Sequence, residues 1–150
     1  MAVKAVIIKE DKVLILRRSK TEMEGSYMNS HQKWDLPGGG LHFFERGDEG
    51  LEREIMEETG LVTDIGLPVS MFDVVKHHIH LCIFTYACVW RGGTVRLSEE
   101  HEAFFWMTEH EAEESELPRW MKRDIHRGFH LAEEKKREEK AKKRQIPPVV

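Results

Sequence analysis

Three glutamates, Glu54, Glu57 and Glu58, stand at spacings that bring carboxylates together on a helix. At about 100° per residue they fall within roughly one third of the circumference of an α-helix. Carboxylates crowded in this way repel one another at neutral pH, and a bound cation relieves that repulsion. Clustered carboxylate oxygens suit a hard ion such as Mg²⁺, which keeps water ligands and takes further ligands from substrate phosphates. The pattern therefore predicts a divalent-metal site on one face of a helix.

The element that must carry these glutamates is a helix with recognisable ends. We expect Asp48 to be its N-cap and Gly60 to stop it. Leu51 and Ile55 form an apolar pair beside the acidic face and can anchor the helix to a core. Gly50 lies on the acidic side, where a mid-helix glycine costs about 1 kcal/mol relative to alanine. It predicts either close approach of a backbone or ligand, or tight packing of the helix.

The glutamates belong to a longer pattern of fixed spacings. Gly39 is followed after five residues by Glu45 and, after seven more, by the run Arg53-Glu54-Ile55-Met56-Glu57-Glu58-Thr59-Gly60-Leu61. An acidic amphipathic helix alone explains the glutamates but not the glycines at both ends. The pattern matches the complete signature of the Nudix hydrolases, and the run Trp34-Asp35-Leu36-Pro37-Gly38-Gly39 matches the usual approach to it. The chain resembles this family over roughly its first 130 residues.

The resemblance implies a fold, an activity and a cofactor. The expected fold is an α/β/α sandwich with a mixed sheet. The expected activity is hydrolysis of a nucleoside diphosphate linked to another group, with Mg²⁺ as the metal and Mn²⁺ as a substitute. The expected partner is a small nucleotide, and the chain is expected to be a monomer or a homodimer.

The resemblance also implies roles for individual residues. Glu54 is the expected general base, a role that members of the family give to different glutamates. Arg53 is expected to orient the glutamates through charge-assisted hydrogen bonds. Glu45 is expected to support the site by hydrogen bonding or a water-mediated metal contact. The expected metal ligands are the carbonyl oxygen of Gly38 and the carboxylates of Glu54, Glu57 and Glu58.

Three residues outside the signature are further candidates. Glu100 precedes Trp106 by six residues, where many relatives carry a glutamate that acts on metal or water; the alternative is a solvated acidic loop. Arg17 and Arg18 end an expected strand, and alternation places them on opposite faces, so one of them can reach the site. The resemblance implies a phosphate contact for them, and the alternative is a pair of surface arginines.

The histidines His77, His78 and His80 suggest a different kind of metal site. His78 and His80 are expected to share one strand face, and imidazole pairs suit Zn²⁺ or Cu²⁺ better than Mg²⁺. Because no third ligand is evident, a hydrogen-bonded or substrate-facing role is the favoured interpretation.

Aromatic side chains offer candidates for stacking on a nucleotide base, although most are expected to be core or edge residues. These are Trp34, Phe43, Phe44, Phe84 and Tyr86. Relatives commonly carry Pro-Gly, or a similar pair, where this chain has Phe43-Phe44. We therefore expect a different loop conformation just before Glu45, with an effect on substrate choice.

Size and charge favour a single cytoplasmic domain. The chain has 150 residues and a net charge of −4, which gives no general attraction for nucleic acid or anionic membranes. It contains no long apolar run and no export signal. Cys82 and Cys88 are expected about 20 Å apart on one strand, too far to form a disulfide. Free thiols are typical of a reducing compartment.

The remaining patterns predict the order of elements. A hairpin is expected from strands at residues 2–9 and 12–17, followed by a long polar connection over residues 19–32. Further strands are expected at residues 69–75, 79–90, 94–97 and 103–107, and helices at residues 109–113 and 120–131. Residues 1–131 are the predicted Nudix domain. Residues 132–150 are a predicted charged tail, helical or disordered, in which Pro147-Pro148 ends any helix.

The sequence also bears on the substrate. Lys76 and residues 77–79 stand where the family carries its markers for ADP-ribose and for diadenosine polyphosphates. The missing markers favour hydrolysis of a nucleoside triphosphate to the monophosphate and pyrophosphate. The alternatives are a nucleotide-sugar or dinucleotide polyphosphate hydrolase, and a non-catalytic nucleotide-binding module. The last would be expected to lose glutamates of the signature, and this chain keeps them.

Overall fold

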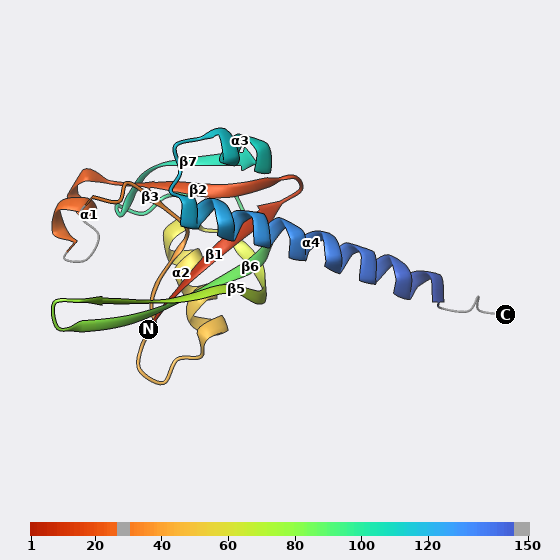
Figure 1. Ribbon diagram of the computed structural model, residues 1–150, viewed down its shortest axis with the longest axis horizontal. Helices are drawn as coiled ribbons and strands as arrows, with labels where there is room; N and C mark the ends of the chain where they lie inside the picture. The colour runs from red at the N-terminus through yellow and green to blue at the C-terminus, as the bar shows by residue number, and fades with distance from the viewer. Residues whose placement is uncertain (27–30, 146–150) are drawn as a thin grey trace.

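The computed structural model describes residues 1–26 and 31–145 and shows a mixed α/β architecture (Figure 1). The strands are β1 (Ala2–Lys9), β2 (Lys12–Arg18), β3 (Trp34–Asp35), β4 (Gly38–Gly40), β5 (Val62–Lys76), β6 (Ile79–Gly92) and β7 (His101–Thr108). The helices are α1 (Lys20–Gly25), α2 (Gly47–Thr59), α3 (Glu109–Glu114) and α4 (Arg119–Gln145).

The strands form a seven-stranded mixed sheet with the order β3-β2-β1-β6-β5, to which β4 adds beside β1 and β7 beside β2. β1 and β6 run parallel, with Ala2 opposite Ile83, and the other pairs are antiparallel. β1 and β2 form the expected hairpin. The sheet thus brings the ends of β1, β2 and β4 to one place, where a site can form.

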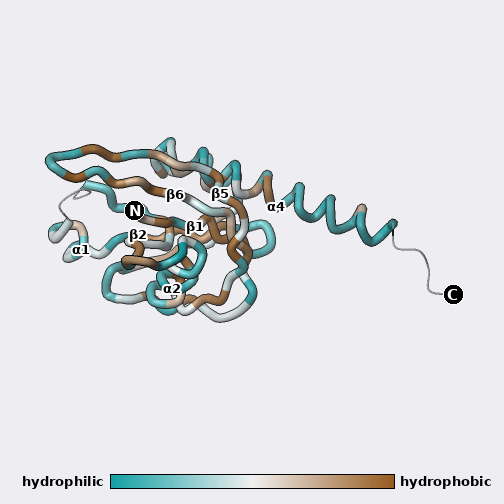
Figure 2. Tube along the Cα trace, turned by 90° about the horizontal axis from the view of Figure 1, so that it is seen from below, coloured by the Kyte–Doolittle hydropathy of each residue, from teal (hydrophilic) through white to brown (hydrophobic). Residues whose placement is uncertain are grey.

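Alternation along β1 builds two apolar cores, one on each face of the sheet. Figure 2 shows α4 on one side of the strands and α2 on the other. The first core contains Val3, Ala5 and Ile7 of β1 with Leu51 and Ile55 of α2. The second contains Val6 and Ile8 of β1 with Met121 and Ile125 of α4. Two helix layers around a mixed sheet confirm the predicted α/β/α sandwich.

The boundaries of α2 differ in part from the prediction. Arg46 occupies the N-cap position without a side-chain hydrogen bond, and Asp48 lies inside the first turn, so the predicted N-cap was wrong. An acidic residue in that turn still interacts favourably with the helix dipole. Gly60 ends the helix in the left-handed conformation, as predicted.

Two expected strands were placed wrongly. β5 begins at Val62, seven residues before the predicted start, because register shifts around Ile65 and Pro68 interrupt its alternation. Residues 94–97 form no strand. Instead, the backbone N–H of Arg96 donates to the carbonyl of Thr59, at the end of α2. That segment satisfies helix carbonyls rather than a sheet neighbour.

The polar connection before β3 contains a short helix. Ser19 is the N-cap of α1, and its side chain accepts a hydrogen bond from the N–H of Glu22. Residues 27–30 of the expected connection lie outside the described residues. Cys82 and Cys88 both lie in β6 and are free thiols, as predicted.

α4 is one continuous helix that passes through the predicted boundary at residue 131. Its buried residues, Met121, Asp124, Ile125 and Gly128, all lie in the first half. The second half projects from the body of the molecule (Figure 1). The division between domain and tail therefore stays a prediction, and Pro147-Pro148 lie outside the described residues. Within the described residues no helix is long and apolar enough to cross a membrane.

A chain ending at Ala132 is expected to keep its turnover and most of its thermal stability. Residues 133–145 are exposed, so their removal loses little apolar burial. Their ion pairs, such as Glu133 with Arg137, contribute about 0.2–0.5 kcal/mol each. Activity assays and melting curves on both chains check this. A large loss of either property would mean that the tail packs on the domain or on a second subunit, and sedimentation separates those cases.

Candidate active site

A cavity of about 670 Å³ lies where α2 meets the ends of the sheet. Its polar wall includes Arg18 of β2, Glu54 and Glu58 of α2, and Glu100, which precedes β7. Its apolar wall is formed by Phe72 and Val74 of β5, Ile83 of β6 and Trp120 of α4. The cavity thus combines acidic, basic and aromatic groups from elements that are distant in the sequence.

The predicted acidic face of α2 divides into two parts. Glu54 and Glu58, one turn apart, both line the cavity. The Glu57 side chain is 58% exposed and lies beside the cavity rather than in its wall. Two of the three predicted carboxylates therefore reach the same space directly.

Arg53 links the glutamates of the signature to one another. Its guanidinium makes a two-pronged pair with Glu45, at 2.8 Å and 2.9 Å. It also donates to Glu54 at 3.0 Å and to Glu57 at 3.3 Å. The hydrogen bonds from Arg53, followed by one from the backbone N–H of His42, lower the pKa of Glu45 to about 2. The structure thus places Arg53 where the sequence predicts it, between the carboxylates.

Two glycines allow these carboxylates to approach. A Cβ atom at Gly39 would stand 2.7 Å from the carboxyl carbon of Glu54, which is closer than real Cβ contacts. A Cβ at Gly50 would stand 2.3 Å from the Leu41 side chain and 2.8 Å from the Glu45 carboxylate. Of the two explanations for Gly50, close packing inside the protein is therefore the correct one.

Glu58 is the most buried carboxyl of the site, with 3% of its surface exposed. It accepts a hydrogen bond of 3.0 Å from the backbone N–H of Gly38. Burial raises the pKa of Glu58 to about 9, against the opposing charge of Lys4 and that hydrogen bond. A carboxyl whose pKa is raised by burial releases its proton more readily when a cation binds to it. The contact involves the N–H of Gly38, so the role of its carbonyl as a metal ligand stays a prediction.

Glu100 joins Glu58 in the cavity. One ligand atom each from Glu58, Glu100 and His101 lie within 4.8 Å of one another. Carboxylate oxygens from two elements at this spacing fit a divalent cation that also keeps water ligands. Glu100 lines the cavity but also lies in an exposed turn, so the choice between a site role and a solvated acidic loop stays open.

A charge network at the wall of the cavity, in which Lys4 and Asp35 are partly buried, was not predicted. Lys4 lies 2.8 Å from one Asp35 oxygen, and the Nε2 atom of His101 lies 2.9 Å from the other. Burial tends to lower the pKa of Lys4, but the charges of Asp35 and Glu58 outweigh it and raise that pKa. The sequence did contain one indication of this network, a single lysine inside the apolar run of β1. A charge buried there without a partner is costly, so the lysine implies an acidic partner.

Only one of the two candidate arginines lines the cavity, and a register shift between them interrupts the alternation of β2. Arg18 lines the cavity, and its guanidinium donates to the Gln32 carbonyl at 2.9 Å. Arg17 lies outside the cavity wall and pairs with Glu102 at 2.9 Å. Of these two arginines, Arg18 is the one placed to meet a ligand of this cavity.

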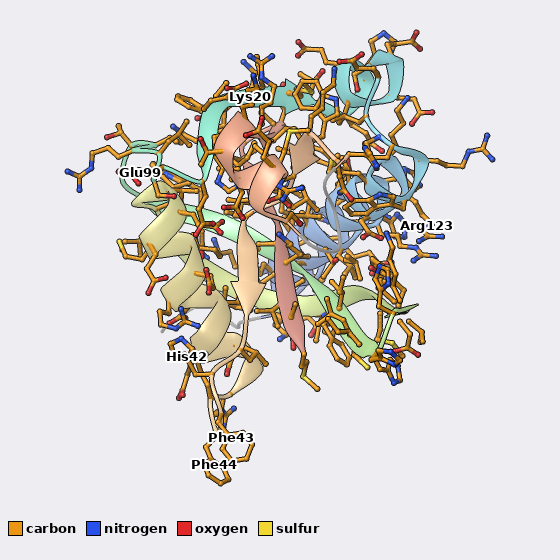
Figure 3. The ribbon with its side chains drawn as sticks, turned by 90° about the vertical axis from the view of Figure 1, so that its left-hand side faces the viewer. Lys20, His42, Phe43, Phe44, Glu99 and Arg123 are labelled. Carbon is orange, nitrogen blue, oxygen red and sulfur yellow. The ribbon has the colours of Figure 1, made fainter. Side chains whose placement is uncertain are left out.

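The candidate histidines and aromatics lie elsewhere. His77 and His78 fall in the turn before β6, so the prediction that His78 and His80 share a strand face was wrong. Phe43 and Phe44, with 88% and 96% of their surfaces exposed, form the tip of a projecting loop (Figure 3). The other three predicted stacking residues, Trp34, Phe84 and Tyr86, pack against the cores.

Comparisons with known proteins show the family to which the chain belongs. A model of the NUDIX domain matches residues 1–129. A MutT-like protein of Streptomyces ambofaciens is 30% identical over 76% of this chain and 67% of its own length. The nucleoside triphosphatase NudI of Escherichia coli is 33% identical, in a match that spans 50% of this chain and 61% of that protein.

Solved structures share the fold. The crystal structure of the MutT protein from Methanosarcina mazei Go1 is 28% identical, with a TM-score of 0.66 over 87% of this chain and 93% of that one. A hydrolase of the NUDIX family from Clostridium perfringens reaches a TM-score of 0.69 at 16% identity, covering 87% of this chain and 95% of that chain. With the signature, the sandwich and the family match in agreement, the chain belongs to the Nudix hydrolase family.

Proposed function

We propose that this Nudix hydrolase cleaves a nucleoside triphosphate to the monophosphate and pyrophosphate with the help of Mg²⁺, for which Mn²⁺ can substitute. The observation that carries the proposal is the cavity whose wall contains Glu54, Glu58 and Glu100 together with Arg18. Acidic groups that hold cations and a basic group that binds phosphate are both needed for a polyphosphate substrate. The named relatives, a MutT-like protein and a nucleoside triphosphatase, support this substrate class.

The metal site of this proposal comprises the Gly38 carbonyl with Glu54, Glu57 and Glu58. A bound cation lowers the pKa of water and offsets the charge on the phosphoryl oxygens. Glu100, whose carboxylate lies near that of Glu58, contributes to the same site as a ligand or by orienting water.

The chain's own groups supply the proton transfer and the positioning. In the proposed step, the oxygen of a water attacks phosphorus while the bond to the departing pyrophosphate breaks. Glu54 accepts the proton of that water. Arg53 fixes the Glu54 carboxylate through its 3.0 Å hydrogen bond, and Glu45 fixes Arg53 in turn. Such support keeps a base in position for proton transfer.

Replacing Arg18 by methionine is expected to raise KM for the triphosphate by about tenfold or more, since a hydrogen bond to a charged group contributes about 1.5–3 kcal/mol. Methionine keeps apolar bulk at this mostly buried position. Arg17→Met is the matched control, because Arg17 lies outside the cavity and pairs with Glu102. Steady-state kinetics, with melting curves of both variants, check the result. If the two variants have equal KM values, Arg18 does not bind the phosphates of the substrate.

The proposed reaction is tested by incubating the protein with nucleoside triphosphates, nucleotide sugars, ADP-ribose and dinucleotide polyphosphates, each with Mg²⁺ and with Mn²⁺. Chromatography is expected to resolve a monophosphate and pyrophosphate from the triphosphates. Release of orthophosphate alone, or activity confined to the other substrates, would reject the proposal. Saturable nucleotide binding without turnover would support the non-catalytic alternative.

A further inference from the structure

An aspartate, a histidine and a cysteine, side chains of types that can bind metal ions, lie together on the hairpin formed by β5 and β6. Asp73 stands directly opposite Cys82, and His80 precedes Cys82 by two residues on the same strand. Residues two apart on a strand and residues directly opposite across a pair point to the same face. The three side chains therefore project together from one face of the hairpin, and their ligand atoms lie within 4.8 Å of one another.

The distances within this group are close to those of a tetrahedral metal centre. The Cys82 sulfur lies 2.9 Å from an oxygen of Asp73 and 4.0 Å from the Nε2 atom of His80. That nitrogen lies 3.2 Å from the same Asp73 oxygen. Around tetrahedral Zn²⁺, with bonds of about 2.0–2.3 Å, neighbouring ligand atoms are separated by about 3.3–3.6 Å. Small rotations of partly exposed side chains bridge the difference.

The geometry points to a site for Zn²⁺, or a similar borderline metal ion, held by Asp73, His80 and Cys82, with water in the fourth position. Thiolate and imidazole are poor ligands for Mg²⁺ and good ones for Zn²⁺, so the site is chemically distinct from the glutamates of α2. The Cys82 thiol donates a hydrogen bond to Asp73. On binding, the thiol loses its proton to solvent and the thiolate takes the metal.

The position of the site gives it a consequence for the cavity. The pairing of β1 with β6 extends only as far as Ile83, so residues 79–82 pair with β5 alone. This end of the hairpin projects from the sheet (Figure 1). Its opposite face carries Phe72, Val74 and Ile83, which form the apolar wall of the cavity. A two-stranded ribbon is marginally stable by itself, so a metal that joins its strands holds that wall in place.

Co²⁺ is a suitable probe because a thiolate ligand gives it a charge-transfer band in the near ultraviolet, whereas carboxylates do not. The protein is titrated with Co²⁺ in excess Mg²⁺ and a non-thiol reductant. The band is expected to reach its plateau at about one equivalent, and Zn²⁺ is expected to bleach it. Absence of the band from the wild-type protein would overturn the proposal, whatever the outcome of the hydrolysis assays.

Variants identify the ligands. Cys82→Ser is expected to abolish the band, and a band that persists in it would overturn the assignment. Asp73→Asn and His80→Asn are each expected to weaken Co²⁺ binding by at least roughly 10–100-fold. Loss of a group that only supports a metal ligand already has an effect of that size, and loss of a ligand itself should cost no less. Cys88→Ala and His78→Asn are the matched controls, because Cys88 is buried in the core and His78 precedes the strand. If the ligand variants bind Co²⁺ as tightly as the controls do, the three side chains are ordinary cross-strand neighbours and form no metal site.

Discussion

Glu54→Gln is expected to lower kcat by about 10²–10⁴-fold, the contribution of a positioned general base. The side chain lines the cavity, is fixed by Arg53, and is accommodated by the missing side chain of Gly39. Glutamine keeps the size of the side chain and an oxygen for the hydrogen bond from Arg53, but it cannot take a proton from water. The loss should therefore appear in kcat at saturating nucleotide and metal.

Two companion variants make this result interpretable. Glu52→Gln, an exposed position outside the acidic face, is expected to match the wild type. Glu57→Gln is expected to weaken metal binding, measured as a higher Mg²⁺ concentration at half-maximal rate. If Glu54→Gln keeps the wild-type kcat, another group is the base, and Glu100→Gln is then the next variant to assay. If Glu54→Gln and Glu57→Gln both match the wild type, as the control Glu52→Gln should, the assignment of the site to α2 is wrong.

The spacing of residues in the sequence correctly predicted those structural features that depend on a single helix or strand. Helix periodicity placed Glu54 and Glu58 on one face of α2, and both line the cavity. The apolar run of β1 was a reliable sign of a buried strand, because both its faces pack against helices. These features depend on neighbours within a few residues, and such information is present in the sequence.

Features that depend on distant parts of the chain were missed. The Lys4–Asp35 pair joins residues 31 apart, and the Asp35–His101 contact joins residues 66 apart. No local pattern connects them, because each becomes evident only when the sheet brings the strands together. The start of β5 was missed for a different reason: Gly66 and Pro68 resemble a loop, but they lie at register shifts inside a strand.

The loop before α2 also combines a feature that is visible in the sequence with a position that only the fold reveals. The expected difference in loop conformation from relatives stays a prediction. Phe44 adopts a positive φ of 65°, which is uncommon for a bulky residue. The two rings contact each other at 4.4 Å between centroids and lie outside the cavity wall. Their predicted effect on substrate choice therefore requires an indirect route through Glu45, the residue that follows them.

Without divalent metal, the protein is expected to lose stability as pH rises above the ordinary range of a carboxyl group, and Glu58→Gln is expected to remove much of that loss. Burial raises the pKa of Glu58 to about 9 from its usual 4.5. Between those values the folded protein binds a proton that the unfolded chain has released. The stability from protonated Glu58 is therefore full below the unfolded pKa and is lost as pH rises through the folded one.

The slope from this one group is at most about 1.4 kcal/mol per pH unit. Urea denaturation in the presence of a chelator, from pH 6 to pH 8.5, measures the free energy of unfolding of the wild type and of Glu58→Gln. Glutamine is the chosen substitute because its amide oxygen can still accept a hydrogen bond from the Gly38 N–H. Titrating groups that do not interact with Glu58 affect both proteins equally, so the difference between the two profiles reports Glu58 together with its charged neighbours, chiefly Lys4. Glu52→Gln should run parallel to the wild type. Saturating Mg²⁺ should flatten the wild-type profile, because the metal takes the place of the proton. Parallel profiles for wild type and Glu58→Gln would mean that Glu58 is already ionised at neutral pH, stabilised by Lys4 and the Gly38 N–H.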